Sequence, residues 1–190
     1  AIIHRNGIPF FFINGYVSFP LSSVSETMVG TLSAAFAPRT DEALVLGVAS
    51  GATASTVGLI FDHVDAVEIN AVVLENLFRM AEYNFDIENL DSVNIVHDDG
   101  IHFIKTTEKK YSLIVNSVSK PLYFLSSKLY TRDFLESVSS RLKPDGVYTT
   151  WLSRSTGDRG IDIILETLKG TFENCWLTFL KSSYYLLVCS

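Results

Sequence analysis

Short apolar runs alternate with amphipathic segments along most of the chain, from residue 43 onward. The runs have the length and composition of buried strands, whereas the segments between them repeat apolar residues at helical spacing. Strands that alternate with helices in this way build a parallel sheet. We expect strands near 43–48, 64–69, 93–97, 111–116 and 145–151, and helices over 52–61, 71–84, 100–106, 129–142 and 158–170.

The last part of the chain departs from this rhythm. Two apolar runs, 174–180 and 184–189, are separated only by Lys181-Ser182-Ser183, which predicts a hairpin. The hairpin would add one antiparallel strand to the sheet. The pattern therefore predicts an α/β fold with a doubly wound, mainly parallel, Rossmann-like sheet and a C-terminal antiparallel hairpin.

A small N-terminal β-hairpin is expected before this domain. Two apolar runs between Ile8 and Phe19 flank Asn14-Gly15, which is the strongest short-range hairpin signal. Its aromatic side chains are expected to pack on the core, with a partner surface as the alternative. We divide the chain into a hairpin appendage, residues 1–21, and a Rossmann-like nucleoside-binding domain, residues 22–190.

The segment 22–37 predicts a helix, with Ser22 or Ser23 as N-cap and Pro38 as the stop signal. Its apolar residues recur at a spacing of four, which predicts one buried face. The residues of that face are Val24, Met28, Leu32 and Phe36.

The turn after the first strand of the main domain is the strongest functional signal. Gly47 and Gly51 bracket it, a helix opens at once, and the next strand ends in Glu68. Glycines allow a ligand to approach the backbone closely, and an acid about 20 residues further on binds the hydroxyls of a ribose. This arrangement predicts a nucleoside site.

In an open parallel sheet the ligand lies at the carboxyl ends of the strands, so the residues just after each strand are the site candidates. Asp99 is one of these candidates for ligand contact. It could instead be the N-cap of the helix that follows it. Asn116 follows the fourth strand and is a candidate for contact with a ligand. The candidate binding residues are Gly47, Ser50, Gly51, Glu68, Ile69, Asp98, Asp99, Gly100, Asn116 and Ser117.

Composition narrows the class of protein. The chain has 190 residues, 47% of them hydrophobic, a formal net charge of −6 and a pI near 5.1. This acidity argues against a nucleic-acid-binding surface. No apolar run reaches the roughly 18 residues of a membrane span, so we expect no membrane contact from this segment and a cytoplasmic location.

Cysteines and histidines provide no metal-ligand pattern. Cys175 and Cys189 lie in the last segment, where buried free thiols are favoured over a disulfide. The four histidines are scattered along the chain. We therefore expect no metal.

Taken together, several motifs resemble the spermidine synthase family of polyamine aminopropyltransferases. The resemblance spans nearly the whole chain, and the order of the motifs makes it specific. The motifs are Phe12-Ile13-Asn14-Gly15, Gly47-Val48-Ala49-Ser50-Gly51, Val67-Glu68-Ile69-Asn70, Asp98-Asp99-Gly100, Tyr111-Ser112-Leu113-Ile114-Val115-Asn116, Leu129-Tyr130-Thr131-Arg132-Asp133-Phe134 and Leu142-Lys143-Pro144-Asp145-Gly146-Val147.

The resemblance implies a class I methyltransferase-like sheet that binds decarboxylated S-adenosylmethionine and transfers its aminopropyl group to a polyamine nitrogen. Glu68 would then bind the ribose, and Asp99-Gly100 the adenine. S-adenosylmethionine or methylthioadenosine would fit the same nucleoside site. The resemblance also implies a homodimer.

The acceptor side departs from the family pattern. Asn116 stands where the family has a catalytic aspartate, Ser119 replaces a second aspartate, and Ser50 replaces the aspartate that binds the aminopropyl amine. A tyrosine-histidine-glutamate stretch is reduced to Val24-Ser25-Glu26. Asparagine cannot take a proton from the attacking amine. We therefore expect aminopropyl transfer to be impaired or lost.

Alternatives remain at this point. The same sheet supports a methyltransferase that acts on another acceptor, because fold does not determine function. A non-catalytic domain could use the rim for binding or the N-terminal hairpin for association. A nicotinamide-dependent dehydrogenase is disfavoured, because the turn lacks the third glycine of the dinucleotide motif.

Overall fold

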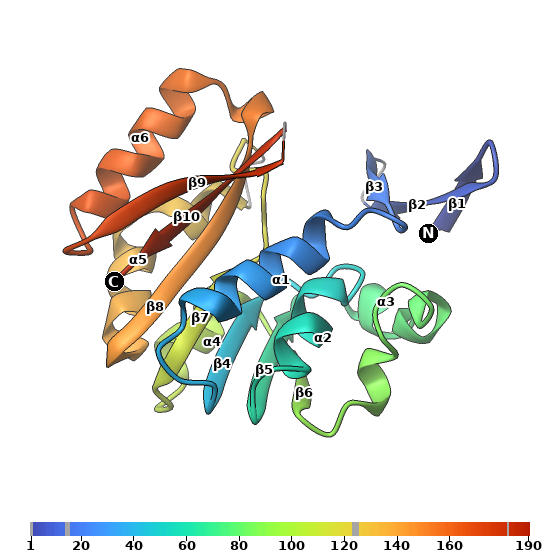
Figure 1. Ribbon diagram of the computed structural model, residues 1–190, viewed down its shortest axis with the longest axis horizontal. Helices are drawn as coiled ribbons and strands as arrows, with labels where there is room; N and C mark the ends of the chain where they lie inside the picture. Colours follow the sequence, from blue (N-terminus) through green and yellow to red (C-terminus); the bar gives the residue numbers. More distant parts are fainter. Residues whose placement is uncertain (1, 14–15, 123–125, 182) are drawn as a thin grey trace.

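The computed structural model describes residues 2–13, 16–122, 126–181 and 183–190. Within these residues, seven strands form one sheet in the order β6-β5-β4-β7-β8-β10-β9 (Figure 1). All neighbouring pairs are parallel except those of β10, which runs antiparallel to both β8 and β9. The strands are β4 (Glu42–Leu46), β5 (His63–Glu68), β6 (Val93–His97), β7 (Tyr111–Asn116), β8 (Leu142–Ser153), β9 (Cys175–Lys181) and β10 (Tyr184–Cys189).

Helices cover both faces of the sheet, and each face has its own hydrophobic core. Val29, Val57 and Val73 contribute to one core from α1 (Ser25–Phe36), α2 (Ala52–Gly58) and α3 (Ala71–Leu74). The core of the other face is built from α4 (Gly100–Thr106), α5 (Arg132–Arg141) and α6 (Asp158–Lys169). The predicted doubly wound, mainly parallel sheet with a C-terminal antiparallel hairpin is confirmed.

The long helix predicted over 71–84 is wrong. After α3 the chain continues through the 3-10 turns η1 (Leu77–Met80) and η2 (Ile87–Asn89). The side-chain amide of Asn84 donates to the carbonyl of Leu77 at 3.2 Å, and Phe85 and Asp86 have positive φ angles. A side chain that takes a backbone carbonyl competes with helix formation. Val73, Leu77 and Met80 are nevertheless buried.

The predicted buried face of α1 is only partly right. Met28 and Leu32 are partly buried and pack against the core, whereas Val24 is 55% exposed and Phe36 is 46% exposed. The helix crosses α2 so closely that a Cβ on Gly30 would lie 2.8 Å from Cβ of Thr56. Small side chains are selected at such a contact. The residues that α1 buries are Ser25, Glu26, Val29, Gly30, Ser33 and Ala34.

The start of α1 differs from the expected cap. Val24 occupies the N-cap position and provides no side-chain bond. The hydroxyl of Ser23 accepts from the backbone N–H of Ser25 at 3.3 Å. The predicted serine therefore interacts with the first turn, one residue before the cap.

The N-terminal hairpin is confirmed as part of a larger element. Strands β1 (Ile2–Arg5), β2 (Ile8–Ile13) and β3 (Tyr16–Pro20) form a three-stranded antiparallel sheet in the described part of the chain. It extends to one side of the main sheet (Figure 1). The expected turn at Asn14-Gly15 lies outside the described residues. The strand β1 was not predicted, although Asn6-Gly7 before β2 is the same hairpin signal.

The expectation that Cys175 and Cys189 are free thiols is wrong. Cys175 and Cys189 face each other across β9 and β10 and form a disulfide bond, with a Cα–Cα distance of 4.2 Å. Free thiols were expected because buried cysteines were interpreted as small apolar side chains, although the predicted hairpin, with its turn at residues 181–183, itself places Cys175 opposite Cys189. The hairpin register brings the two residues together.

The described residues lack two features that would indicate a membrane span or a metal site. No helix among them has the length and apolar character needed to cross a bilayer. No group of three or more His, Cys, Asp or Glu side chains among them could hold a metal ion.

Candidate nucleoside-binding site

The predicted site residues meet at the carboxyl rim of the sheet. Strand order reverses between β4 and β7, which is where a doubly wound sheet opens a crevice. Backbone bonds join neighbouring rim segments: Ser117 N–H donates to Leu46 O at 2.9 Å, and Asp98 N–H donates to Glu68 O at 3.2 Å. The topology therefore places the four strand ends side by side.

The turn between β4 and α2 has the strained backbone that its glycines predict. Gly47 has a φ of +88° and Gly51 a φ of +95°, which side chains other than glycine rarely adopt. A Cβ on Gly51 would also lie 3.1 Å from the side chain of Asn84. Both glycines are therefore required by the shape of the turn.

Glu68 holds this turn. Its side chain is 7% exposed. One carboxylate oxygen accepts from the backbone N–H groups of Val48 and Ala49 at 3.0 and 3.1 Å, and the other accepts from Asn70 N–H at 2.9 Å. A carboxylate has about four acceptor positions, so these three bonds leave room for a further donor.

Asp98 and Asp99 have separate partners. Asp99 is the N-cap of α4 and accepts from Ile101 N–H at 2.7 Å, as its structural interpretation predicted. Asp98 accepts from His102 Nδ1 at 2.9 Å. The bond from His102 is the main cause that lowers the pKa of Asp98 below its ordinary value. Gly100 follows, at the first position of α4.

Ile69 is the apolar member of the rim. It is 63% exposed, directly after Glu68. Its carbonyl contacts the ring of His97 through Nε2 at 3.2 Å. An exposed aliphatic side chain directly after Glu68 can cover one face of a flat, polar-edged ring.

Asn116 is completely buried, and its amide bonds to the protein. The Nδ2 group lies 3.3 Å from the hydroxyl of Tyr148 and 3.5 Å from the carbonyl of Leu129. The Oδ1 atom accepts from Val118 N–H at 3.2 Å. Ser117 is also buried, and its carbonyl accepts from the indole of Trp151 at 2.7 Å.

Glu26 and Asn84 were not placed in the site by the sequence. Ser50 donates through Oγ to Oε2 of Glu26 at 2.6 Å, and the Ser50 carbonyl accepts from Asn84 Nδ2 at 2.9 Å. Burial raises the pKa of Glu26 from 4.5 to about 7. The sequence analysis named Glu26 only as the remaining acid of the Val24-Ser25-Glu26 stretch, and Asn84 lay within a predicted helix, so neither was assigned to the site.

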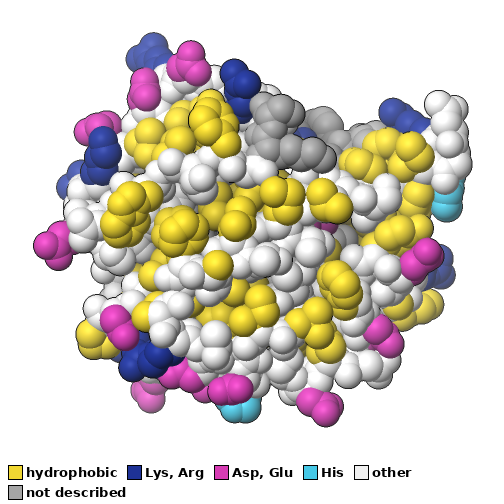
Figure 2. All heavy atoms as spheres, in the orientation of Figure 1, with side chains coloured by type: hydrophobic (Ala, Val, Ile, Leu, Met, Phe, Trp, Pro, Cys, Tyr) yellow, Lys and Arg dark blue, Asp and Glu magenta, His cyan; other side chains and the backbone are white. Residues whose placement is uncertain are grey.

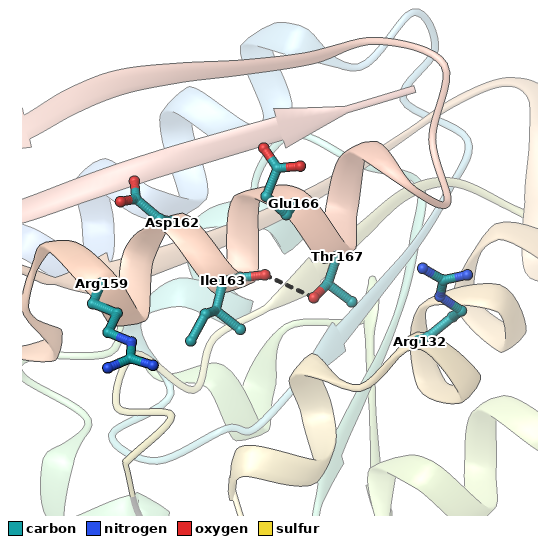
Figure 3. A pocket seen from close by; sticks show the side chains of 6 residues that line it. All are labelled: Arg132, Arg159, Asp162, Ile163, Glu166 and Thr167. Atoms are coloured by element: carbon teal, nitrogen blue, oxygen red, sulfur yellow. Dashed lines mark hydrogen bonds between the residues drawn. The ribbon is translucent and has the colours of Figure 1, made fainter.

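A hollow of about 480 Å³ lies elsewhere, along α6 and the first residue of α5 (Figure 3). None of the predicted site residues lines it. Its charges are mixed, with two arginines and two acids. The lining residues are Arg132, Arg159, Asp162, Ile163, Glu166 and Thr167. This hollow is separate from the carboxyl rim, where the chemistry was expected.

Comparison with curated proteins points to one family. Residues 22–172 match the model of the spermine/spermidine synthase domain. The chain is 26% identical to the polyamine aminopropyltransferase of Streptococcus uberis over 140 residues, which cover 71% of this chain and 48% of that protein. It is 32% identical to the polyamine aminopropyltransferase of Sulfolobus acidocaldarius over 117 residues, 58% of this chain and 38% of that protein.

Solved structures share the fold. A spermidine synthase in complex with the transition state analogue AdoDATO matches with a TM-score of 0.86 and 16% identity, over 100% of this chain and 69% of that chain. Human methyltransferase-like protein 13 in complex with SAH matches with a TM-score of 0.70 and 22% identity, over 87% of this chain and 81% of that chain.

The sheet order and these structural matches define a methyltransferase-like Rossmann domain. The family model covers most of the chain, and the chain belongs to the spermine/spermidine synthase family. It spans about half, or less, of the length of the curated relatives described above.

Proposed function

We propose that the carboxyl rim binds an S-adenosyl nucleoside: decarboxylated S-adenosylmethionine, S-adenosylmethionine or methylthioadenosine. The observation that supports this most directly is Glu68, whose buried carboxylate is held at the turn by three backbone bonds and keeps an acceptor position for a ribose hydroxyl. The complexes with AdoDATO and SAH in the matching folds agree with a ligand of this class.

The other predicted residues would complete the nucleoside site. Asp98 or Asp99 would accept from the exocyclic amine of adenine, and Ile69 would cover the ring. The remaining predicted residues would contact the other parts of the ligand. They are Gly47, Ser50 and Gly51 of the turn, with Gly100, Asn116 and Ser117. No metal is part of this proposal.

Aminopropyl transfer to a polyamine is impaired in this proposal. The attacking amine arrives protonated and needs a group that takes its proton. Asn116 at the catalytic position cannot be that group, and its amide already bonds to Tyr148 and Val118. A polyamine would therefore lack a general base at this position.

Calorimetry tests the nucleoside proposal. We expect methylthioadenosine to bind the wild-type chain, and Glu68→Gln to weaken it by about 10-fold or more, because a charge-assisted bond contributes about 1.5–3 kcal/mol. Glu75→Gln, an exposed acid on the surface, is the matched control and should bind like the wild type. No binding of any of the three nucleosides at millimolar concentration would remove the proposal.

A product assay with decarboxylated S-adenosylmethionine and a panel of amines tests the chemistry. Wild-type product formation should be weak, and Asn116→Asp should raise it by about 100-fold or more, which is the usual contribution of a general base. Spermidine formation by the wild type at an ordinary turnover rate would contradict the proposal. An unchanged rate in the variant would indicate wider remodelling of the acceptor site.

A methyltransferase with another acceptor is the second candidate, and the match to human methyltransferase-like protein 13 in complex with SAH supports it. Methyl transfer from labelled S-adenosylmethionine to a cell extract would separate it from the first. A non-catalytic domain would show no turnover in either the product assay or the methyl-transfer assay. It would still bind a nucleoside, or it would associate with a partner through the N-terminal sheet.

The remaining expectations concern partners and place. A homodimer, the absence of nucleic-acid binding and a domain boundary after residue 21 stay predictions, which light scattering, DNA titration and limited proteolysis would test. The cytoplasmic location also stays a prediction. The Cys175–Cys189 disulfide weighs against it, because disulfides are rare in the cytosol and persist in oxidising compartments.

A further inference from the structure

The strand β9 forms one edge of the main sheet, and within the described chain β10 is the strand that pairs with it. Among the side chains that the structure describes in β9, the exposed ones are apolar: Trp176 is 55% exposed, Leu177 40% and Phe179 68%. The strand at the opposite edge, β6, exposes polar residues instead, Asn94 and His97. The two edges therefore offer different surfaces to a partner.

The β9 edge lacks the features that usually prevent an edge strand from pairing with another chain. Such features are charged side chains, prolines, bulges or a covering segment. Positions 174–180 contain no charged residue and no proline. The pairing of β9 with β10 is regular from Cys175 to Phe179, and its register shift lies beyond them, at the hairpin end. A regular, uncharged and exposed edge is a template for a further strand.

The hydrogen bonds to β10 show which backbone groups of β9 face the free edge. Asn174 and Ser190 exchange two N–H to carbonyl bonds, at 3.0 and 2.9 Å. Bonded and non-bonded pairs alternate along an antiparallel ladder, so Cys175 belongs to a non-bonded pair. The Cα–Cα distance of 4.2 Å across the disulfide agrees, because non-bonded pairs are the narrow ones. The N–H and carbonyl groups of Cys175, Leu177 and Phe179 therefore point away from β10.

We propose that β9 is a docking edge for a second copy of this chain, with the two β9 strands antiparallel about a two-fold axis at Leu177. The N–H of each Leu177 would donate to the carbonyl of the other, and Cys175 of each copy would exchange bonds with Phe179 of the other. This register pairs all the outward-facing residues with one another. A register centred on Cys175 or Phe179 would instead extend beyond the regular part of the strand.

The side chains and charges favour a second copy as the occupant. In this register Leu177 meets Leu177, and Trp176 lies opposite Thr178 of the second copy, so the exposed apolar side chains contact uncharged ones. The sequence has a glutamate at position 173 and a lysine at position 181, and these two positions lie opposite each other at both ends of the pair. Opposite charges at both ends favour this antiparallel alignment.

The proposed interface does not depend on the nucleoside site. Antiparallel pairing would join the two sheets into one and turn their carboxyl rims in opposite directions, so each rim would belong to a single copy. The interface is also distinct from the N-terminal sheet, the other surface considered for association, because the two sheets share no strand. An assembly through β9 is therefore separable by experiment from both.

The experiment on the wild-type chain combines size-exclusion chromatography with light scattering and residue-resolved amide hydrogen exchange. We expect a dimer at micromolar concentration. In that dimer the N–H groups of Cys175, Leu177 and Phe179 should exchange slowly, because each is bonded to the second copy. In a monomer they would exchange fast, whereas those of Trp176 and Thr178 are bonded to β10 in either state.

Three variants test the position of the interface. Leu177→Lys places two lysines opposite each other at the two-fold axis and should raise the dissociation constant of the dimer by about 100-fold or more. Glu173→Lys replaces attraction by repulsion at both ends of the pair and should raise it on the order of 10-fold. Leu59→Lys, which changes a 57% exposed leucine at the end of α2, is the matched control and should dimerise like the wild type.

Three outcomes would overturn the inference. The first is a wild-type chain that stays monomeric at millimolar concentration. The second is a dimer in which the outward N–H groups of β9 exchange fast, which would indicate assembly through another surface such as the N-terminal sheet. The third is a dimer that Leu177→Lys and Glu173→Lys leave as tight as the wild type. The wild-type measurements decide the question even if Leu177→Lys does not fold.

Discussion

Two buried glutamates accept hydrogen bonds from the turn between β4 and α2, and their surroundings differ. Glu68 is held by three backbone N–H groups, which suit a charged carboxylate. Glu26 has one serine hydroxyl as its side-chain partner, and burial raises its pKa to about 7. The same residue type thus has different hydrogen-bond surroundings at the two positions.

The raised pKa of Glu26 predicts a pH dependence of stability in the ligand-free protein. The folded state keeps this proton up to about pH 7, whereas the unfolded chain releases it near 4.5. The folded state therefore binds more protons between these values, and the free energy of unfolding falls as pH rises through this window. In Glu26→Gln, the decrease in the free energy of unfolding between pH 5 and pH 8 should be smaller than in the wild type, by up to about 3 kcal/mol. Urea unfolding at pH 5, 6, 7 and 8 measures it.

The prediction is contradicted if the free energy of unfolding has the same pH dependence in the wild type and in Glu26→Gln. The loss of stability at acidic pH has a different origin and should be the same in the wild type and in Glu26→Gln. Burial raises the pKa of Asp65, but bonds from Lys109, Asn94 and Tyr111 outweigh it and lower the pKa overall. That contribution is complete above the unfolded pKa of about 4 and is lost as pH falls further, outside the window of Glu26.

At the scale of elements, the contact between α1 and α2 positions the acid. Gly30 lets the two helices approach, and Thr53 bonds to the backbone of Glu26. Ser33 of α1 bonds to Thr149 of β8 at 2.7 Å, which fixes the helix on the sheet. The polar, small-residue face of α1 thus places Glu26 beside Ser50, and the apolar face remains partly exposed.

Gly30→Ala tests this packing. The added methyl group would overlap Thr56 and the carbonyl of Thr53, where overpacking costs about 1–3 kcal/mol, and alanine's better helix propensity offsets about 1 kcal/mol. We expect a net loss of about 1 kcal/mol in the free energy of unfolding, measured with urea. Thr31→Ala, the exposed neighbour, should stay within about 0.5 kcal/mol of the wild type. A Gly30→Ala variant as stable as the wild type would show that the helices separate freely.

At the scale of the whole molecule, the sheet ends in an edge strand with an apolar surface. Trp176 and Phe179 of β9 are largely exposed, and apolar side chains gather on the face of the molecule that α1 crosses (Figure 2). The Cys175–Cys189 disulfide joins this edge to β10 near the C-terminus. The last strand pair is thus held covalently as well as by its ladder.

Removing the disulfide should destabilise the domain. The bond closes a loop with a sequence separation of 14, for which chain-entropy arguments give about 3 kcal/mol. The double variant Cys175→Ala, Cys189→Ala should lose about this much free energy of unfolding. Reductant should lower the stability of the wild type towards that of the variant and leave the variant unchanged. Equal wild-type stability with and without reductant would contradict the prediction.

The sequence by itself determined the order of strands and helices, the doubly wound sheet and the rim position of residues such as Glu68 and Asp99. These features follow from local periodicity, glycine conformation and the rule that parallel strands end at one edge. The broken helix after Leu74 escaped prediction, because Asn84 captures a backbone carbonyl only once the chain has folded around it.

Only the tertiary structure decided that α1 buries its small-residue face and where Glu26 lies. Each depends on partners distant in the sequence: α2 beside Gly30, and Ser50 bonded to Glu26. Local patterns report how apolar a segment is, whereas long-range packing decides what that segment contacts. The position of Glu26 beside Ser50 belongs to the second kind of information.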